Sequence, residues 1–351
     1  MLRQHHATLI IIIHKGSVQR LIFWGILIII LLIVGLIVDQ LYYRIIRLFL
    51  EKHTAQLVRL YTFLAVMVLM VGGYLMGHYV TRLQVEITTA EIESEKLPAS
   101  FDGFRIAQIS DFHIGSFFDE RGKQFVPQLV DEIIAQQPDI IVFTGDLVSM
   151  RAAEALPFRS ELKRLASAGI PVYSIMGNHD YADYMRHFDD QRRKQDVDSL
   201  MNLQREAGWQ MLNNTTALLH RGNDSIAIVG VENIGEPPFS VYGNLANAMQ
   251  PIGGLSGADN LFTILLSHNP THWTSEVIPQ TDIDLTLSGH THDMQFRLFG
   301  WSPSGVKYDH HAGLYQQGHQ YLYVNTGVGC VGPKLRVGVK PEVTILTLKK
   351  N

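Results

Sequence analysis

Two long apolar runs stand near the beginning of the chain, over residues 21–38 and 60–80, and neither contains Asp, Glu, Lys or Arg. About 20 apolar residues in a helix are enough to cross the hydrocarbon core of a bilayer. We therefore predict two transmembrane helices that form a hairpin. Two buried core helices, or a cleavable signal peptide in place of the first span, are the alternatives. Uncharged runs of this length are uncommon in soluble domains, and no small-residue cleavage pattern follows Val38.

The segment between the two spans is amphipathic and is predicted to lie on the membrane surface. Leu41, Ile45 and Leu48 share one helical face, whereas Arg44 and Arg47 lie on the other. Basic residues occur both inside and outside the hairpin, so the positive-inside rule does not fix its orientation. After residue 80 the chain becomes polar, and we place a domain boundary near residue 82. This division gives a membrane anchor over residues 1–81 and a second domain over residues 82–351.

The second domain shows short apolar runs that are typical of strands buried on both faces. These runs occupy residues 105–110, 139–144, 171–176, 225–230, 262–267 and 284–289, and an alternating run ends the chain at 342–348. Apolar residues recur at helical spacing over 125–134, and residues 154–168 also read as a helix. Strands and helices in alternation predict an α/β fold with layered sheets and helices outside.

Composition narrows the classes of function. The net charge of −4 gives no basic excess, so nucleic acid is not an expected partner. Cys330 is the only cysteine, which excludes both an internal disulfide and a cysteine-based zinc site. The chain has 16 histidines, and several fall in short motifs that also contain Asp or Asn. This clustering is the first indication of metal chemistry.

Five of the predicted strands end at residues that can bind a metal or transfer a proton. The ligand candidates are Asp111, His113, Asp146, Asn178, His268, His290 and His292, and the candidates for proton transfer are His179 and Asp180. In α/β sheets, ligands bind beyond the carboxyl ends of the strands, so these side chains are expected to share one site. Each motif alone is weak, because Asp-x-His or Gly-Asp usually marks a turn. The ordered set, with each motif behind a strand, is far more specific.

The motifs Asp-Phe-His (111–113), Gly-Asp (145–146), Gly-Asn-His-Asp (177–180), Ser-His (267–268) and Gly-His-Thr-His (289–292) together resemble the calcineurin-like metallophosphoesterase superfamily, and in particular its bacterial membrane-associated branch. The resemblance covers residues from about 84 to the end of the chain and implies a four-layered α/β/β/α sandwich. It also implies two divalent metal ions. One would be held by Asp111, His113, Asp146 and His292, and the other by Asp146, Asn178, His268 and His290.

The resemblance implies hydrolysis of a phosphodiester or pyrophosphate bond. A hydroxide shared by the two ions would attack phosphorus in line. We expect His179 to act as general acid and Asp180 to orient its imidazole. Nitrogen and oxygen ligands without thiolate favour Mn, Fe or Zn. The chain departs from many relatives at Asp293 and Met294, where they carry Gly-Gly after the last motif.

Substrate and location follow from the anchor. Relatives of this branch cleave UDP-2,3-diacylglucosamine in lipid A biosynthesis, and a membrane hairpin favours such a lipid-linked substrate. We expect a multi-pass protein of the bacterial inner membrane that contacts membrane lipids, with its catalytic domain on the cytoplasmic face, where a UDP-linked substrate would be. Two alternatives stay open: a tethered phosphatase or phosphodiesterase for soluble substrates, and a non-catalytic scaffold. The sequence indicates no oligomeric state.

Overall fold

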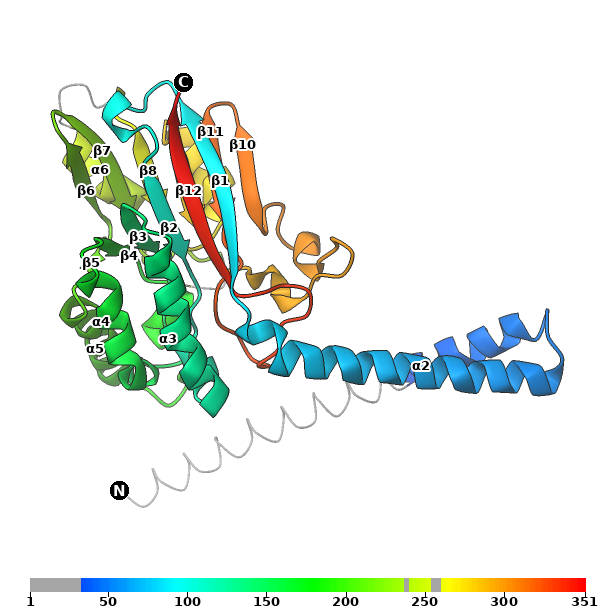
Figure 1. Cartoon of the computed structure of the whole chain (residues 1–351). Helices are drawn as coiled ribbons and strands as arrows, with labels where there is room; N and C mark the ends of the chain where they lie inside the picture. Colours follow the sequence, from blue (N-terminus) through cyan, green and yellow to red (C-terminus); the bar gives the residue numbers. More distant parts are fainter. Residues whose placement is uncertain (1–32, 237–239, 254–259) are drawn as a thin grey trace, which may run out of the picture. The chain divides into compact units, whose positions relative to one another are not determined.

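The structure is a computed structural model, and it describes residues 33–236, 240–253 and 260–351. The chain divides into two compact units, Met1–Gly72 and Gly73–Asn351. Within the described residues, the second unit contains two six-stranded sheets, and each sheet mixes parallel and antiparallel neighbours (Figure 1). This part of the chain is therefore an α/β fold, as the strand and helix pattern predicts.

The first sheet has the strand order β1-β12-β2-β3-β4-β5. Its strands are β1 (Glu86–Ser94), β12 (Glu342–Lys350), β2 (Arg105–Ile109), β3 (Ile140–Phe143), β4 (Val172–Ser174) and β5 (Gln210–Met211). Neighbours are parallel except for β12 and β2. The carboxyl ends of β2, β3 and β4 consequently meet at one edge of the sheet.

The second sheet has the order β10-β11-β9-β8-β7-β6. Its strands are β10 (Gly313–Gln317), β11 (Gln320–Val324), β9 (Leu285–Ser288), β8 (Thr263–Leu266), β7 (Asp224–Gly230) and β6 (Thr215–Arg221). Both outer pairs are antiparallel, and the four central strands run parallel. The carboxyl ends of β8 and β9 therefore also lie at one edge.

Alternating side chains place the sheets between two layers of helices. In β3, Ile140 and Val142 join the core between the two sheets, whereas Ile141 and Phe143 face the first helical layer. That layer consists of α3 (Glu120–Ala135), α4 (Arg159–Ser167) and α5 (Asp190–Glu206). The opposite layer contains α6 (Leu245–Gly253), a π-helical turn (Trp273–Val277) and α7 (Ile278–Gln280). The order is helix, sheet, sheet, helix.

Local signals explain where the helices of the first layer begin. The side chain of Asp119 accepts a hydrogen bond from the backbone N–H of Gly122 and caps α3, and Asp189 caps α5 in the same way. The helix predicted over 154–168 begins later than expected, at Arg159. Pro157 lies in a separate 3-10 turn, Leu156–Phe158, which precedes α4.

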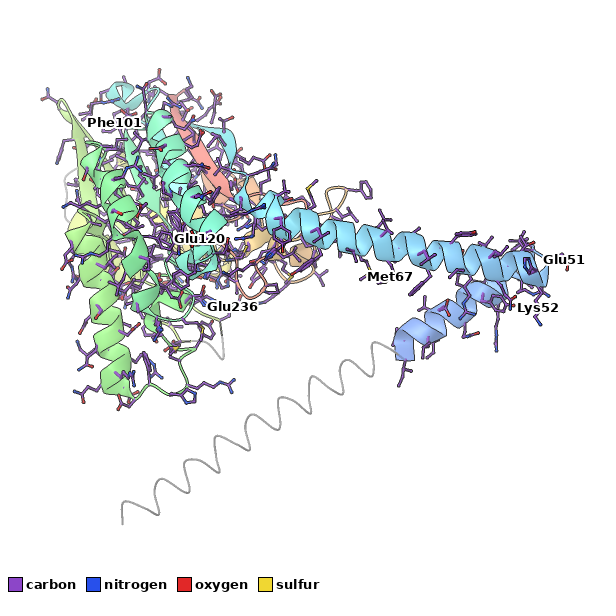
Figure 2. All side chains as sticks on the ribbon, turned by 60° about the horizontal axis from the view of Figure 1, so that its bottom comes forward. Glu51, Lys52, Met67, Phe101, Glu120 and Glu236 are labelled. Carbon is purple, nitrogen blue, oxygen red and sulfur yellow. The ribbon has the colours of Figure 1, made fainter. Side chains whose placement is uncertain are left out.

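The long helix α2 (Lys52–Tyr79) begins at the end where Figure 2 labels Glu51 and Lys52, and Met67 lies midway along it. Its apolar side chains are exposed, and Val68 and Leu69 are 71% and 73% accessible. Among the described residues, one helical stretch is long and apolar enough to cross a membrane. It runs over Lys52–Leu83 with a mean hydropathy of 1.9.

The predicted hairpin of two spans is not confirmed, because most of its first span, residues 21–32, lies outside the described residues. The location of the segment after Val38 on the membrane surface stays a prediction. Residues 33–46 form one helix that continues past Val38, and a turn then leads to α2. Asp39 pairs with Arg59, and Tyr42 hydrogen-bonds to Thr62 over 2.9 Å. The charge of Asp39, which ends the apolar run, is thereby neutralised without ending the helix.

Candidate metal centre and active site

The polar residues that follow five strands lie together where the two sheets meet. Asp111 and His113 follow β2, Asp146 follows β3, Asn178 and His179 follow β4, His268 follows β8, and His290 and His292 follow β9. The first sheet thus supplies carboxylates, an amide and His113, whereas the second supplies imidazoles. The structure brings all seven predicted ligand side chains into one cluster.

One half of the cluster surrounds Asp111. Its Oδ1 lies 3.1 Å from Nε2 of His292 and 3.9 Å from Nε2 of His113. Both imidazole Nε2 atoms are buried and have no hydrogen-bond partner in the described part of the chain. Buried ring nitrogens without partners are costly unless another group satisfies them. The Nε2 atoms of His113 and His292, beside the carboxylate of Asp111, are therefore free to bind a cation.

The other half surrounds Asp146 and Asn178. Oδ2 of Asp146 lies 3.2 Å from Nε2 of His268 and 3.5 Å from Nε2 of His113. Oδ1 of Asn178 lies 3.1 Å from Nε2 of His268 and 2.9 Å from Nδ1 of His290. Oxygen and nitrogen donors from five chain segments therefore converge within contact distance. This donor set suits divalent cations of the Mn, Fe and Zn kind.

Close backbone packing forces glycine at the turns. A Cβ atom on Gly289 would overlap Oγ of Ser110 and Oδ2 of Asp111, and one on Gly177 would overlap Oδ1 of Asp146. The neighbouring ligand residues adopt the left-handed conformation, which is uncommon outside glycine. Those with positive φ are Asp111, His113, Asp146, His290 and His292. Strained residues held by surrounding structure are typical of functional sites.

The electrostatics of the cluster favour cation binding at most positions. Burial opposes ionisation of Asp111 and Asp146, but neighbouring imidazoles, His292 and His268 respectively, hold the pKa of both carboxyls below its usual range. Burial lowers the pKa of His113, and burial together with His268 lowers that of His290 to about 3. Anionic carboxylates and neutral imidazoles are the forms that bind metals.

His268 differs from His113 and His290 in the direction of its pKa shift. Burial opposes its protonation, yet the carboxylate of Asp146 raises its pKa to about 10. Its Nδ1 donates to the backbone oxygen of Thr144 over 2.7 Å, which leaves Nε2 facing Asp146. Because a ligating imidazole is neutral, His268 must lose a proton when a cation binds there.

Asp180 does not orient His179, contrary to our expectation. Its carboxylate accepts hydrogen bonds from the backbone N–H groups of Asp146, Val148 and Gly177 at 2.8–3.1 Å. Burial and the Asp146 carboxylate raise the pKa of Asp180 to about 7, although the backbone donors favour its ionised form. Asp180 therefore fixes the loops that carry the ligands.

The imidazole of His179 is oriented by other groups. Its Nδ1 donates to the backbone oxygen of Ser149 over 2.7 Å, and its ring stacks on Tyr184 with centroids 4.4 Å apart. The backbone N–H of His179 also donates to Oδ1 of Asp146 over 2.8 Å. The remaining ring nitrogen, Nε2, is the atom that His179 can offer to a substrate.

Several residues at the site were not predicted from sequence. The hydroxyl of Tyr308 lies 3.3 Å from Nε2 of His290, and the amide of Asn178 donates to the hydroxyl of Tyr184 over 2.8 Å. The guanidinium of Arg336 is fully buried and donates to the backbone oxygens of Gly329 and Thr326. These residues occur outside the short motifs, so no spacing signal marks them.

A cavity of about 410 Å³ opens beside the cluster and has two chemically different walls. Polar site residues, including Asp146, Asn178, His179 and His290, form one wall. The other wall is mainly apolar and consists of Met294, Phe296, Val331, Pro333, Leu335 and Val337. The cavity can therefore hold a molecule with a polar group at the metal centre and an apolar part beside it.

Asp293 and Met294 adopt a left-handed backbone conformation that glycine would adopt more easily. Their φ angles are 49° and 47°. Asp293 is held in place because its carboxylate accepts from Nε of Arg297 over 2.6 Å and from Nδ1 of His311 over 2.8 Å. Asp293 thus anchors this turn through Arg297 and His311, and Met294 adds one apolar side chain to the lining of the cavity.

Comparison with known proteins identifies the family of the chain. Residues 104–294 match the family described as calcineurin-like phosphoesterase. The chain is 31% identical over 293 residues to the uncharacterized metallophosphoesterase YkuE of Bacillus subtilis (strain 168), covering 79% of this chain and 90% of that protein. The chain belongs to the calcineurin-like phosphoesterase family. It is a metal-dependent phosphoesterase, and thus a hydrolase.

Other relatives differ more in length. The chain is 30% identical to a Danio rerio protein named transmembrane protein with metallophosphoesterase domain, over 76% of this chain and 57% of that protein. An uncharacterized metallophosphoesterase of Aquifex aeolicus (strain VF5) is 27% identical, over 76% of this chain and 92% of that protein. The chain thus spans a little over half of the zebrafish protein.

Proposed function

We propose that this phosphoesterase is anchored in a membrane and cleaves a phosphodiester or pyrophosphate bond in a lipid-linked substrate such as UDP-2,3-diacylglucosamine. The cavity with one polar and one apolar wall carries this proposal. A soluble phosphate ester needs only the polar wall, whereas an acylated substrate would also bury its chains against the apolar one. The catalytic domain would comprise residues 82–351.

Two divalent ions would occupy the cluster. Asp111, His113 and His292 would hold one ion, Asn178, His268 and His290 would hold the other, and Asp146 would contact both. A carboxylate suits the shared position because each of its oxygens can face a different cation. Bound ions would supply Lewis acidity and a water of lowered pKa. The unpartnered Nε2 atoms of His113 and His292 support this assignment.

His179 would protonate the leaving oxygen. The hydrogen bond from its Nδ1 to the backbone oxygen of Ser149 fixes the ring and leaves Nε2 for the substrate. His179 also lines the cavity, next to Asn178 and His290. A positioned general acid needs this combination of fixed orientation and access to the reacting group.

The lipid part of the proposal rests on the end of α2. Leu335 and Val337, which belong to the apolar wall, pack on Gly77 so closely that a Cβ atom there would lie 2.6 Å from Cδ1 of Leu335. Nδ1 of His78 donates to the backbone oxygen of Lys334 over 2.7 Å. The apolar helix therefore ends against the wall of the cavity, which gives an acyl chain a short route from the bilayer.

The anchor would be a hairpin with spans at 21–38 and 60–80, and the catalytic domain would lie on the cytoplasmic face of a bacterial inner membrane. The apolar surface of α2, with Val68 and Leu69 exposed, supports a location in lipid. A nucleotide-linked substrate favours the cytoplasmic side. Protease digestion of inverted and right-side-out vesicles checks the side, since the domain should be cut only in inverted ones.

The substrate is tested with the full chain in detergent, loaded with Mn²⁺. We expect hydrolysis of bis-p-nitrophenyl phosphate, and a lower KM for a diacylated nucleotide sugar than for its deacylated form. Leu335→Ser should raise KM for the acylated substrate by about 10–150-fold, because it removes an apolar contact of about 1.5–3 kcal/mol. The matched variant Leu314→Ser changes an exposed leucine of β10 and should leave KM unchanged.

Two results would contradict parts of the proposal. Equal KM values for acylated and deacylated substrates would indicate a tethered enzyme for soluble esters. Metal binding without turnover of any ester would indicate a scaffold.

A further inference from the structure

Four large apolar side chains are exposed on the segment that follows the last histidine motif. Phe299 is 100% accessible and Val306 is 83% accessible. Trp301 is 58% accessible and Leu298 is 50% accessible. Trp and Phe are rarely left in water without a function, and grouped exposed apolar side chains usually mark an interaction site. We name Leu298, Phe299, Trp301 and Val306 the apolar tip.

The backbone presents Phe299 at the end of a tight turn. Leu298 and Trp301 exchange two backbone hydrogen bonds, of 2.9 and 3.0 Å, around Phe299 and Gly300. Both central residues have positive φ, 51° for Phe299 and 82° for Gly300. Such a turn favours Asn-Gly or Asp-Gly in a protein surrounded by water, and a bulky residue at positive φ is an outlier. Phe299 therefore suits this position poorly unless its ring gains a contact elsewhere.

The base of the turn is held firmly. The backbone N–H of Arg297 donates to the oxygen of Val337 over 2.8 Å, and that of Val337 donates to the oxygen of Gln295 over 2.9 Å. Ser302 donates to the backbone oxygen of Asp293 over 2.9 Å. A short, hydrogen-bonded ribbon thus carries the apolar tip and holds it at a fixed position relative to the site.

This ribbon connects the apolar tip to the end of α2. Its second strand includes Val337, and the adjoining Leu335 packs on Gly77. All of these residues belong to the same compact unit. Lys307 follows the 3-10 turn that ends at Val306 and lies over the ring of Tyr308, whereas Arg297 is paired with Asp293. Aromatic and basic side chains together are typical of a membrane interface.

We propose that the apolar tip inserts into the interfacial region of the phospholipid bilayer that holds α2, and so keeps the mouth of the cavity at the lipid surface. This inference rests on the proposed anchoring of α2 in a membrane. Leu298, Phe299 and Trp301 lie on one narrow turn, and Val306 ends the 3-10 turn that follows it. This apolar surface is small, whereas a stable protein interface needs about 800 Å² on each partner. Its size therefore favours lipid over a protein partner.

Nitroxide labelling of the full chain tests the proposal. Cys330→Ala removes the buried native thiol, and Phe299→Cys, Met67→Cys or Leu156→Cys each add one labelling site. Met67 reports on α2, and Leu156, 55% exposed in a 3-10 turn, reports on a surface of the domain that should stay in water. Figure 2 labels Met67 on α2. The labelled proteins are reconstituted into vesicles of phosphatidylcholine and phosphatidylglycerol.

Collision with oxygen, which dissolves in lipid, is compared with collision with a water-soluble nickel chelate by electron paramagnetic resonance. We expect the oxygen-to-nickel ratio at position 299 to exceed that at position 156 at least threefold. A lipid-exposed label at 67 with equal ratios at 299 and 156 would overturn the inference and leave the anchor intact, and would point to a protein partner for the tip. Water exposure at both 67 and 299 would overturn the anchor as well. Hydrolysis of a soluble diester by Phe299→Cys should match the parent chain and so show an intact fold.

Discussion

His179 and Asp180 are adjacent in the sequence, but their side chains contact different parts of the molecule. His179 faces the cavity and is fixed through the backbone oxygen of Ser149. Asp180 is buried and accepts hydrogen bonds from the backbone N–H groups of Asp146, Val148 and Gly177, which lie in the loops of the ligand residues. One side chain is placed to act on the substrate, and the other holds the loops that carry the ligands.

Substitution of each residue by asparagine separates these roles. His179→Asn should lower kcat by about 10²–10⁴-fold, because a general acid is lost, while the free energy of unfolding changes by less than about 0.5 kcal/mol. Asp180→Asn should lower that free energy by about 1–3 kcal/mol, since an amide NH₂ cannot accept from a backbone N–H. Urea unfolding of the full chain and metal analysis check both variants. Full turnover by His179→Asn with metals bound would contradict its role.

The ligand residues could be predicted from the sequence because each follows a short apolar strand within a few positions. Asp111 and His290 are examples, because in both cases the strand ends two residues earlier. The role of Asp180 could not be predicted, since its partners are backbone groups that the fold brings together. Tyr308 and Arg336 reach the site from long loops, so only the folded chain places them beside His290 and His292.

At the scale of elements, burial explains in part which strands the sequence revealed, although the buried strand β11 was not predicted. β3 and β9 are fully buried and read as continuous apolar runs, so their positions were predicted. β1 (Glu86–Ser94) was missed because most of its residues are exposed or half-exposed and polar. It lies at the edge of the first sheet, where it pairs with β12 and needs few apolar residues on its outer face.

The end of β9 gives a test of how closely the two sheets must approach. Gly289 passes Ser110 and Asp111 without room for a Cβ atom. Gly289→Ala should therefore displace Asp111 and weaken metal binding by about 10–100-fold, as changes next to ligands commonly do. Titration of the chelator-treated full chain with Mn²⁺, followed by calorimetry, measures the affinity.

A matched control is available at the end of α6. Among the described residues, no atom lies within 4 Å of a Cβ atom built on Gly253. Gly253→Ala should leave the Mn²⁺ affinity within twofold of the parent chain. Equal affinities for the two variants would show that the contact at Gly289 has no influence on the metal centre.

At the scale of the whole molecule, the site joins the two sheets. Asp111, Asp146 and Asn178 come from loops of the first sheet, whereas His268 and His290 come from loops of the second. The core between the two sheets, which contains Ile106 and Leu285, is apolar. At this edge, imidazole nitrogens lie close together, and Nε2 of His268 is 3.3 Å from Nδ1 of His290. Ions bound between them would connect the two sheets through metal–ligand bonds.

Removal of metal should therefore affect both activity and stability. A ligand present at about 100 times its dissociation constant stabilises a fold by about 2.7 kcal/mol, which for a domain of this size corresponds to roughly 5–10 °C in Tm. We expect a chelator to abolish hydrolysis of bis-p-nitrophenyl phosphate and to lower Tm by this amount, and Mn²⁺ or Zn²⁺ to restore both. Tryptophan fluorescence during heating measures Tm. Asp146→Ala removes the shared carboxylate, so its Tm should not respond to the chelator; an equal response in this variant would place the stabilising metal elsewhere in the molecule.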